Sequence, residues 1–230
     1  MLLHAVAHNP TGMDPTVEQW HQIVALVKRR GLVVILDNAY QGFASGDLDK
    51  DRLSATLFSA AGIEFFTCQS FAKNMGLYGE RVGMVHVHCA SPAAAKCVLS
   101  QLKLVVRPMY SSPPVHGAEL VIRTLGDQKN YAAWKAELRV TAERIGEMRE
   151  KLTLGLEAKG TPGDWRHITR QIGMFSYTGL TAEQCETLTN EYAIYLLKSG
   201  RISIAGLNHG NVQYVVDAID DVVRRKRAKH

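Results

Sequence analysis

Apolar residues in the first part of the chain alternate between short continuous runs and a helical spacing. Residues 2–7 form an apolar run that ends in the turn sequence HNPTG at 8–12. Trp20, Ile23, Val24 and Val27 then recur as on one face of an amphipathic helix, which Gly31 ends. Runs at 32–36, 65–68 and 84–87 predict three short strands. Strand, helix and strand in this order predict parallel βαβ units in an α/β sheet.

The later part of the chain is dominated by helical periodicity. Residues 91–106 predict a helix, and a further helix runs to about 124 after two prolines. Apolar residues from 131 to 156 then recur at steps of three or four and predict one helix of nearly 30 residues, ended by Gly160 and Pro162. Strands at 174–178 and 202–205 and helices at 181–192 and 212–225 predict a small α/β domain beyond it.

Composition places the chain among globular proteins. Hydrophobic residues make up 46% and charged residues 21% of its 230 residues. No apolar run approaches the roughly 20 residues that a membrane span needs, and the start has no basic region of a signal peptide. We therefore expect no membrane partner.

The charged residues, cysteines and histidines do not indicate a nucleic-acid, disulfide or metal site. The net charge is +5, with the excess at the C-terminal end in Arg224, Arg225, Lys226, Arg227 and Lys229. We interpret this end as the solvated basic terminus of a helix rather than a nucleic-acid site. The four cysteines form no CxxC pair, which favours a reducing compartment over a disulfide framework. His86 and His88 share a strand face without a third ligand nearby, so we expect no metal.

One segment, SFAKNMGLYGERVG, combines residues that could bind a phosphorylated carbonyl compound. Lys73 follows a predicted buried strand, with Ser70 three residues before it and Arg81 eight after it. A lysine at a strand end is usually a surface residue, but a buried lysine with a lowered pKa can form a Schiff base. Ser70 and Arg81 could both reach a phosphate.

A second group of polar residues follows the predicted strand at 32–36. Asp37 stands at the carboxyl end of that strand, where open α/β sheets bind ligands, and Tyr40 follows three residues later. An aspartate there can pair with a pyridinium nitrogen. The alternative is that Asp37 caps a helix. Asn9 also follows a short apolar run, so we expect it at the same sheet edge as Asp37.

Six segments together resemble the aspartate aminotransferase family of fold-type-I enzymes that use pyridoxal phosphate. They are HNPTG, LDNAYQGFASGDLDKD, QSFAKNMGLYGERVG, VRPMYSSPP, QIGMFSYTGL and SGRISIAGL, in family order and spacing. The resemblance implies an α/β aminotransferase-like fold without its N-terminal part. Residues 1–142 would belong to the cofactor-binding large domain and residues 143–230 to the small domain.

The resemblance also implies residue roles toward pyridoxal phosphate. Lys73 would bond the cofactor aldehyde and then move a proton between substrate and cofactor, with Tyr40 as the second catalytic residue. Asp37 would pair with the ring nitrogen, and Tyr40 and Asn9 would bond the ring oxygen. The full cofactor-binding set would be Asn9, Asp37, Tyr40, Ser70, Lys73 and Arg81.

Two arginines would bind substrate. By resemblance, Arg201 clamps the α-carboxylate, and Arg107 reaches across a homodimer to the side-chain carboxylate; Asn9 also contacts substrate. Two guanidinium groups suit dicarboxylates because each binds a carboxylate with two hydrogen bonds. Phe175 matches an aromatic residue near the α-carboxylate, although a core role is an equal alternative.

The implied reaction is amino transfer between L-aspartate and 2-oxoglutarate, giving oxaloacetate and L-glutamate. Two alternatives stay open: an aminotransferase with aromatic specificity, and a non-catalytic fragment. The family's N-terminal portion holds most of the cofactor phosphate, so we expect the 230 residues alone to bind cofactor weakly and to turn over little. The segments VRPMYSSPP and SGRISIAGLNHGNV favour a mitochondrial over a cytoplasmic form.

Overall fold

The computed structural model describes residues 1–225, and the chain divides into two compact units. Residues 1–6 and 15–139 form the first unit, and residues 7–14 together with the chain from Val140 onward form the second. The division falls inside α6 (Gln128–Ala158), three residues before the domain boundary that we expected at 142. Residues 7–14 cluster with the second unit rather than with the sheet that we expected them to adjoin.

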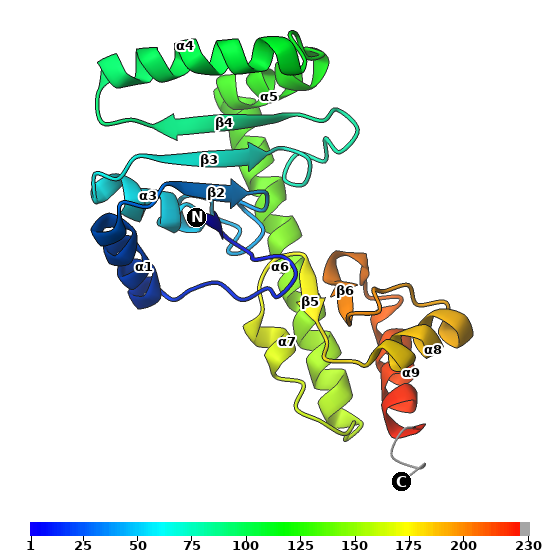
Figure 1. The fold of residues 1–230 in the computed structure, drawn as a ribbon. Helices are drawn as coiled ribbons and strands as arrows, with labels where there is room; N and C mark the ends of the chain where they lie inside the picture. The colour runs from blue at the N-terminus through cyan, green and yellow to red at the C-terminus, as the bar shows by residue number, and fades with distance from the viewer. Residues whose placement is uncertain (226–230) are drawn as a thin grey trace. The chain divides into compact units, whose positions relative to one another are not determined.

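A four-stranded sheet forms the centre of the first unit, with β1 (Leu2–His4), β2 (Val34–Asn38), β3 (Phe65–Ser70) and β4 (Gly83–His88) in spatial order 1-2-3-4 (Figure 1). β1, β2 and β3 run parallel, as the strand–helix–strand pattern predicts. Their carboxyl ends therefore lie at one edge of the sheet. β2 begins and ends two residues later than expected, so Asp37 lies within the strand and not after it.

β4 departs from the parallel arrangement because it runs antiparallel to β3. The cause lies in the connection between them. Residues 71–82 contain only turns and no helix, whereas a parallel crossover usually contains a helix. The chain instead reverses, and Phe71 N donates to Val82 O at 3.2 Å where the two strands separate.

Helix α1 (Val17–Arg30) forms as its apolar spacing predicts. The Thr16 hydroxyl accepts from Gln19 N while the Gln19 side chain accepts from Thr16 N, and Gly31 ends the helix in a left-handed conformation. Sequence reasoning missed α2 (Leu48–Asp51) and α3 (Leu53–Ala60). α1 and α3 pack on one face of the sheet around a core made of Ala5, Trp20, Val24, Val27, Val34, Leu36, Phe58, Ile63 and Phe65.

Three helices follow the sheet. They are α4 (Pro92–Met109), α5 (His116–Gly126) and the 31-residue α6, so the predicted long helix is confirmed. α4 ends three residues beyond its predicted end. Pro108 lies in the last turn of the helix and does not break it. None of its residues is buried. No helix among residues 1–225 combines the length and apolarity of a membrane span.

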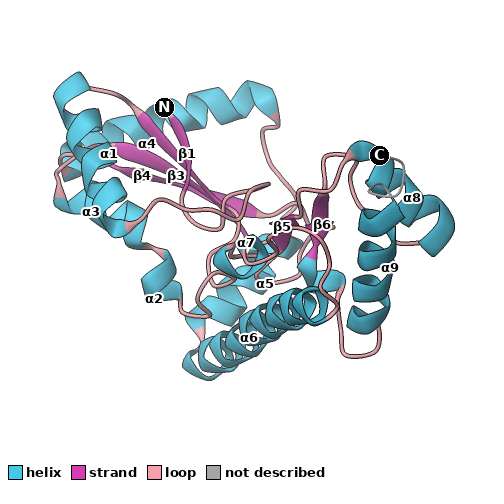
Figure 2. Cartoon of the chain, turned by 90° about the horizontal axis from the view of Figure 1, so that it is seen from below, coloured by secondary structure: helices cyan, strands magenta, loops and turns pink. Residues whose placement is uncertain are grey.

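The second unit contains a two-stranded antiparallel sheet of β5 (Phe175–Tyr177) and β6 (Arg201–Ser203). α8 (Ala182–Tyr192) lies beside α9 (Val212–Arg225) in Figure 2, and both helices confirm their predictions. The remaining elements are α7 (His167–Arg170) and the short 3-10 helix η1 (Ile204–Gly206), which shortens the strand expected at 202–205.

The basic end of α9 is partly defined. Arg224 pairs with Asp220 and Arg225 pairs with Asp221, each one turn earlier, and Arg225 also reaches Glu191 on α8. These pairs agree with a solvated helix end. Lys226, Arg227 and Lys229 lie outside the described residues.

Candidate active site

The carboxyl end of β2 presents Asp37 and leads into Tyr40. Asp37 pairs in register with His4 on one side and Cys68 on the other, and its backbone oxygen accepts from Ala5 N at 2.8 Å. The helix-cap alternative is wrong, because the next helix begins at Leu48 and its cap is Asp47. The Asp37 carboxylate is half-buried and forms no hydrogen bond or ion pair with another residue of the part described, 1–225. It is therefore available to a ligand.

Lys73 lies in the turn after β3, with its amine 5.1 Å from the centre of the Tyr40 ring. Tyr40 is only 5% exposed, so its ring forms a fixed wall beside the amine. Buried Asn74, the next residue, fixes the turn on both sides: its amide donates to Gln41 O at 3.3 Å, and its backbone oxygen accepts from Trp134 Nε1 at 2.7 Å. The lysine is thus held in place and is half-buried, unlike an ordinary surface lysine.

The antiparallel pairing of β3 and β4 brings Ser70 close to Arg81 along the chain reversal. Ser70 pairs in register with Gly83, two residues after Arg81. Gly83 is required because a Cβ there would lie 2.6 Å from Gln69 O. Arg81 has a φ of 51° and donates to Tyr78 O at 3.0 Å, while the Ser70 hydroxyl accepts from Ala72 N at 3.2 Å. Ser70 and Arg81 therefore flank the segment that carries Lys73, and their hydroxyl and guanidinium are groups that bind anions.

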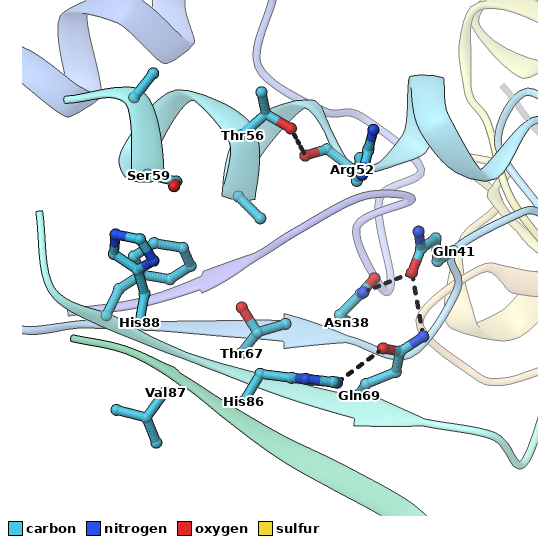
Figure 3. Close-up of a pocket in the computed structure, with 13 residues that line it drawn as sticks. Asn38, Gln41, Arg52, Thr56, Ser59, Thr67, Gln69, His86, Val87 and His88 are labelled. Carbon is cyan, nitrogen blue, oxygen red and sulfur yellow. Dashed lines mark hydrogen bonds between the residues drawn. The ribbon is translucent and has the colours of Figure 1, made fainter. Parts of the chain in front are cut away.

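Sequence reasoning missed Gln41, whose side chain links the two strand ends. Its oxygen accepts from Asn38 Nδ2 at 3.0 Å and from Gln69 Nε2 at 3.1 Å, and Gln69 in turn contacts His86 (Figure 3). Gln41 Nε2 also donates to Leu48 O at 3.0 Å. Because Gln41 also accepts from Asn74, it ties β2 to the lysine turn. The only signal in the sequence was its place one residue after Tyr40.

These polar side chains line a pocket of about 710 Å³ between α3 and the sheet (Figure 3). Asn38 and Gln69 face it, whereas Asp37 and Cys68, their neighbours in the strands, alternate to the other face. The pocket lining contains none of the sequence-predicted site residues. His86 bonds Gln69 and His88 stacks on Phe65 with 5.3 Å between ring centres, which gives both histidines ordinary structural contacts.

Arg107 lies near the end of α4. It is exposed and donates to Ser111 Oγ at 2.8 Å. A shallow pocket of about 370 Å³ beside it is lined by Leu99, Leu102, Lys103, Val106, Arg107 and Ser111. The described contacts leave Arg107 apart from the Lys73 turn, so the structure does not bring this residue to the other site residues of the first unit.

In the second unit, Arg201 and Asn9 are in direct contact. Arg201 Nη1 donates to Asn9 Oδ1 at 2.8 Å, and its guanidinium carbon lies 4.5 Å from the centre of the Phe175 ring. Arg201 starts β6 after Gly200, whose φ of 87° only glycine adopts readily. A half-buried guanidinium on an aromatic face suits a carboxylate ligand. Phe175 thus has a contact beyond core packing.

The loop that carries Asn9 is held by Asp14, a second residue that sequence reasoning missed. Its two carboxylate oxygens accept from Ala7 N at 2.6 Å and from His8 N at 2.8 Å. Gly12 N donates to His8 O at 2.7 Å, and His8 Nδ1 contacts Thr11 Oγ1 at 2.7 Å. The HNPTG motif is therefore a closed turn that presents the Asn9 side chain.

Comparisons with known proteins identify the family. Aspartate aminotransferase 1 of Medicago sativa is 55% identical over 98% of this chain and 54% of its own. A crystal structure of the aspartate aminotransferase of Trypanosoma cruzi matches 97% of this chain and 57% of its own, with 50% identity and a TM-score of 0.92. An aromatic-amino-acid aminotransferase of Burkholderia pseudomallei, solved covalently bound to pyridoxal phosphate, matches with 44% identity and a TM-score of 0.93.

The chain spans about half the length of the relatives that it matches. Relatives named mitochondrial, from Dictyostelium discoideum, and cytoplasmic, from Oryza sativa, are both 51% identical, so identity does not separate the two compartments. The family model described as aminotransferase class I and II matches residues 1–219. With the fold, the motifs and the relatives in agreement, the chain belongs to the class I and II aminotransferases.

Proposed function

We propose that the chain carries the catalytic lysine and substrate-binding arginines of a pyridoxal-phosphate-dependent aspartate aminotransferase. The reaction moves the amino group of L-aspartate to 2-oxoglutarate and leaves oxaloacetate and L-glutamate. The observation that carries the proposal is the Lys73 amine, which lies 5.1 Å from the Tyr40 ring, with Asp37 just before Tyr40 in the chain, one residue from the end of β2. The 55% identity to an aspartate aminotransferase supports it.

The side chains present fit pyridoxal phosphate. An amine, an unpartnered carboxylate and a buried phenol lie at one sheet edge, and a hydroxyl and a guanidinium lie beside them: Lys73, Asp37, Tyr40, Ser70 and Arg81. The amine complements an aldehyde, the carboxylate a ring nitrogen and the phenol a ring hydroxyl, while the hydroxyl and the guanidinium together complement a phosphate. When bound, the cofactor supplies an aldehyde that condenses with amines and a ring that withdraws electrons from the substrate α-carbon.

Each residue of the first unit then has a defined task. Lys73 would bind the aldehyde and, once released, would take the proton from the substrate α-carbon as a general base and deliver it to the cofactor as a general acid. Asp37 keeps a proton on the ring nitrogen through an ion pair. Tyr40 lies against the amine and restricts its movement, which matters because proton transfer depends on sub-ångström placement.

The arginines divide the recognition of a dicarboxylate. Arg201, with Asn9 and Phe175 in contact, binds the α-carboxylate that every amino acid substrate carries. Arg107 binds the side-chain carboxylate of aspartate or glutamate. Its exposure on α4 is consistent with a site that a partner subunit completes.

We also propose a homodimer. α4 has no buried residue, although it carries the apolar side chains Leu99, Leu104, Val105 and Met109, each more than half exposed. A helix with large apolar side chains on several sides is normally buried, and association would cover them. Sedimentation analysis should give twice the chain mass, and Leu104→Lys should return the monomer.

Aromatic specificity is the second candidate function, supported by the match to the aromatic-amino-acid aminotransferase. Rates with aspartate and with phenylalanine separate the two.

A mitochondrial location is proposed because of the segments VRPMYSSPP and SGRISIAGLNHGNV. Imaging of the native protein against a mitochondrial marker tests this location.

The test compares the chain alone with a chimera in which the N-terminal portion of the Medicago sativa relative precedes it. We expect little turnover from the chain alone, and aspartate-dependent oxaloacetate formation from the chimera that Lys73→Ala abolishes. A folded chimera that transaminates neither aspartate nor phenylalanine would contradict the proposal. Preference for phenylalanine would support the second candidate.

A further inference from the structure

A buried guanidinium in the second unit has no acidic partner. Arg149, on α6, is 4% exposed, and burial lowers its pKa to about 10, so it stays protonated at neutral pH. Among residues 1–225 no carboxylate pairs with it. A buried charge without a counter-charge is costly and is retained where its hydrogen bonds are needed.

Those hydrogen bonds go to the backbone of one short segment. Arg149 Nη1 donates to Ile168 O at 3.0 Å, and Nη2 donates to Gly173 O at 2.7 Å and to Phe175 O. The three carbonyls span the end of α7 and the start of β5. A planar fork of donors can bind several oxygens in a fixed geometry, which a lysine ammonium on a flexible stem does not. Arg149 therefore fixes the path of residues 168–175.

Residues 168–175 contact Arg201 and also the HNPTG loop, which carries its hydrogen-bond partner Asn9. Phe175 lies under the Arg201 guanidinium at 4.5 Å. On its other side the segment holds the HNPTG loop, because Ile172 N donates to Gly12 O at 2.8 Å and a Cβ on Gly173 would lie 2.6 Å from Ala7 Cβ. A shift of the segment would move Phe175 and the loop that carries Asn9.

We propose that Arg149 is a positioning residue that sets the orientation of the Arg201 guanidinium through Phe175 and the HNPTG loop. The consequence for carboxylate binding rests on the proposed function of Arg201. Arg149 Nε and the hydroxyl of Thr153, one turn along α6, are both buried without a partner among residues 1–225. An apolar side chain would avoid the cost of the buried charge but would leave the carbonyls of Ile168, Gly173 and Phe175 without this donor, so the three hydrogen bonds are what an arginine supplies here.

The experiment follows the Arg201 Nε–H resonance by NMR in the ligand-free chain, assigned by its loss in Arg201→Lys. The ring under the guanidinium should shift this signal upfield in the wild type. Arg149→Met removes the fork at similar volume, and Arg149→Lys keeps only the charge. Both should return the signal to the position of a free arginine. Titration with succinate, a dicarboxylate, should give about tenfold weaker binding in both variants.

The matched control is Val216→Ala, which removes methyl groups packed against Gly155 of α6 and leaves the three carbonyls untouched. Its free energy of unfolding is measured beside that of Arg149→Met. Retention of the shifted signal in Arg149→Met, or its equal loss in Val216→Ala, would overturn the proposal, as would an unshifted wild-type signal. A wild-type signal that is shifted but insensitive to succinate would refute the substrate role of Arg201 and leave the positioning role supported.

Discussion

Arg201 and Asn9 are 192 residues apart in the chain, and Arg201 Nη1 donates to Asn9 Oδ1 at 2.8 Å. The contact joins the HNPTG motif to the SGR motif within the second unit. An amide oxygen satisfies one donor of the guanidinium without neutralising its charge. Arg201 is thus oriented and still able to attract a carboxylate.

Replacing Asn9 distinguishes orientation from charge. Asn9→Ala should weaken succinate binding a few-fold, since Arg201 loses the hydrogen bond that orients it. Asn9→Asp should weaken it more, because the new carboxylate competes with the ligand for the guanidinium. Calorimetric titration of both variants measures the order. Tighter binding in Asn9→Asp than in Asn9→Ala would contradict this role.

The two arginines should have separable effects on substrate choice. In the active chimera, Arg107→Ala should reduce kcat/KM for aspartate far more than for phenylalanine, by the equivalent of roughly 2–5 kcal/mol. Arg201→Ala should reduce both, since every amino acid has an α-carboxylate. Steady-state kinetics with the two substrates provide the comparison, and equal losses in Arg107→Ala would assign that residue a structural role.

Asp51 holds the loop after Tyr40, and its raised pKa predicts that the free energy of unfolding depends on pH. Its carboxylate accepts from Gly42 N at 2.7 Å, Ala44 N at 3.2 Å and Ser45 N at 3.1 Å, yet burial raises its pKa above the ordinary value of 3.8. The part of its contribution to the free energy of unfolding that depends on the bound proton is therefore complete below that value and is lost as pH rises through the raised pKa.

The measurement is denaturant unfolding of wild type and Asp51→Asn from about pH 3 to pH 6. The Asn variant cannot titrate, so the difference between the two proteins should change between pH 3.8 and the raised pKa and become constant above that pKa. At neutral pH the variant should be less stable by about 1–3 kcal/mol, since its NH₂ group faces backbone donors. A pH-independent difference would show that Asp51 does not titrate in this range.

Replacing Thr153 by valine should maintain or raise the stability of the protein, unlike the substitutions above. Its hydroxyl is buried and unpartnered within the described chain, and the residue is 3% exposed. Thr153→Val keeps the shape and removes the unpaired group, so stability should stay equal or rise by about 1 kcal/mol. Thr153→Ser should fall below both because it deletes a methyl group from the core. Thermal unfolding of the three proteins ranks them.

Local patterns predicted most of the elements. Helical spacing located α1, α6, α8 and α9, because an amphipathic face and a cap such as Thr16 or Thr181 are written in adjacent residues. Sequence reasoning did not predict α2 and α3, because these helices are short and their apolar residues, which lie against α1 and the sheet, do not show a clear helical spacing. The direction of β4 followed from the connection before it, which sequence reasoning did not weigh.

The site was predicted in part. Motif positions gave Lys73, Asp37 and Tyr40, and the structure places Lys73 against Tyr40. The residues that hold them could not be predicted, because Gln41 and Asn74 act through contacts between segments 33 residues apart. Arg149 likewise donates to backbone carbonyls 19 to 26 residues away. Every residue has a backbone carbonyl, so the sequence does not indicate which ones accept these hydrogen bonds.

Covalent trapping at Lys73 tests the central claim most directly. The chain is incubated with pyridoxal phosphate, reduced with borohydride, digested and mapped by mass spectrometry, with Lys73→Arg and Asp37→Ala in parallel. We predict one dominant pyridoxyl-modified peptide, the one containing Lys73, which is absent in Lys73→Arg and diminished in Asp37→Ala. Modification spread evenly over the lysines, or unchanged total labelling in Lys73→Arg, would contradict the account.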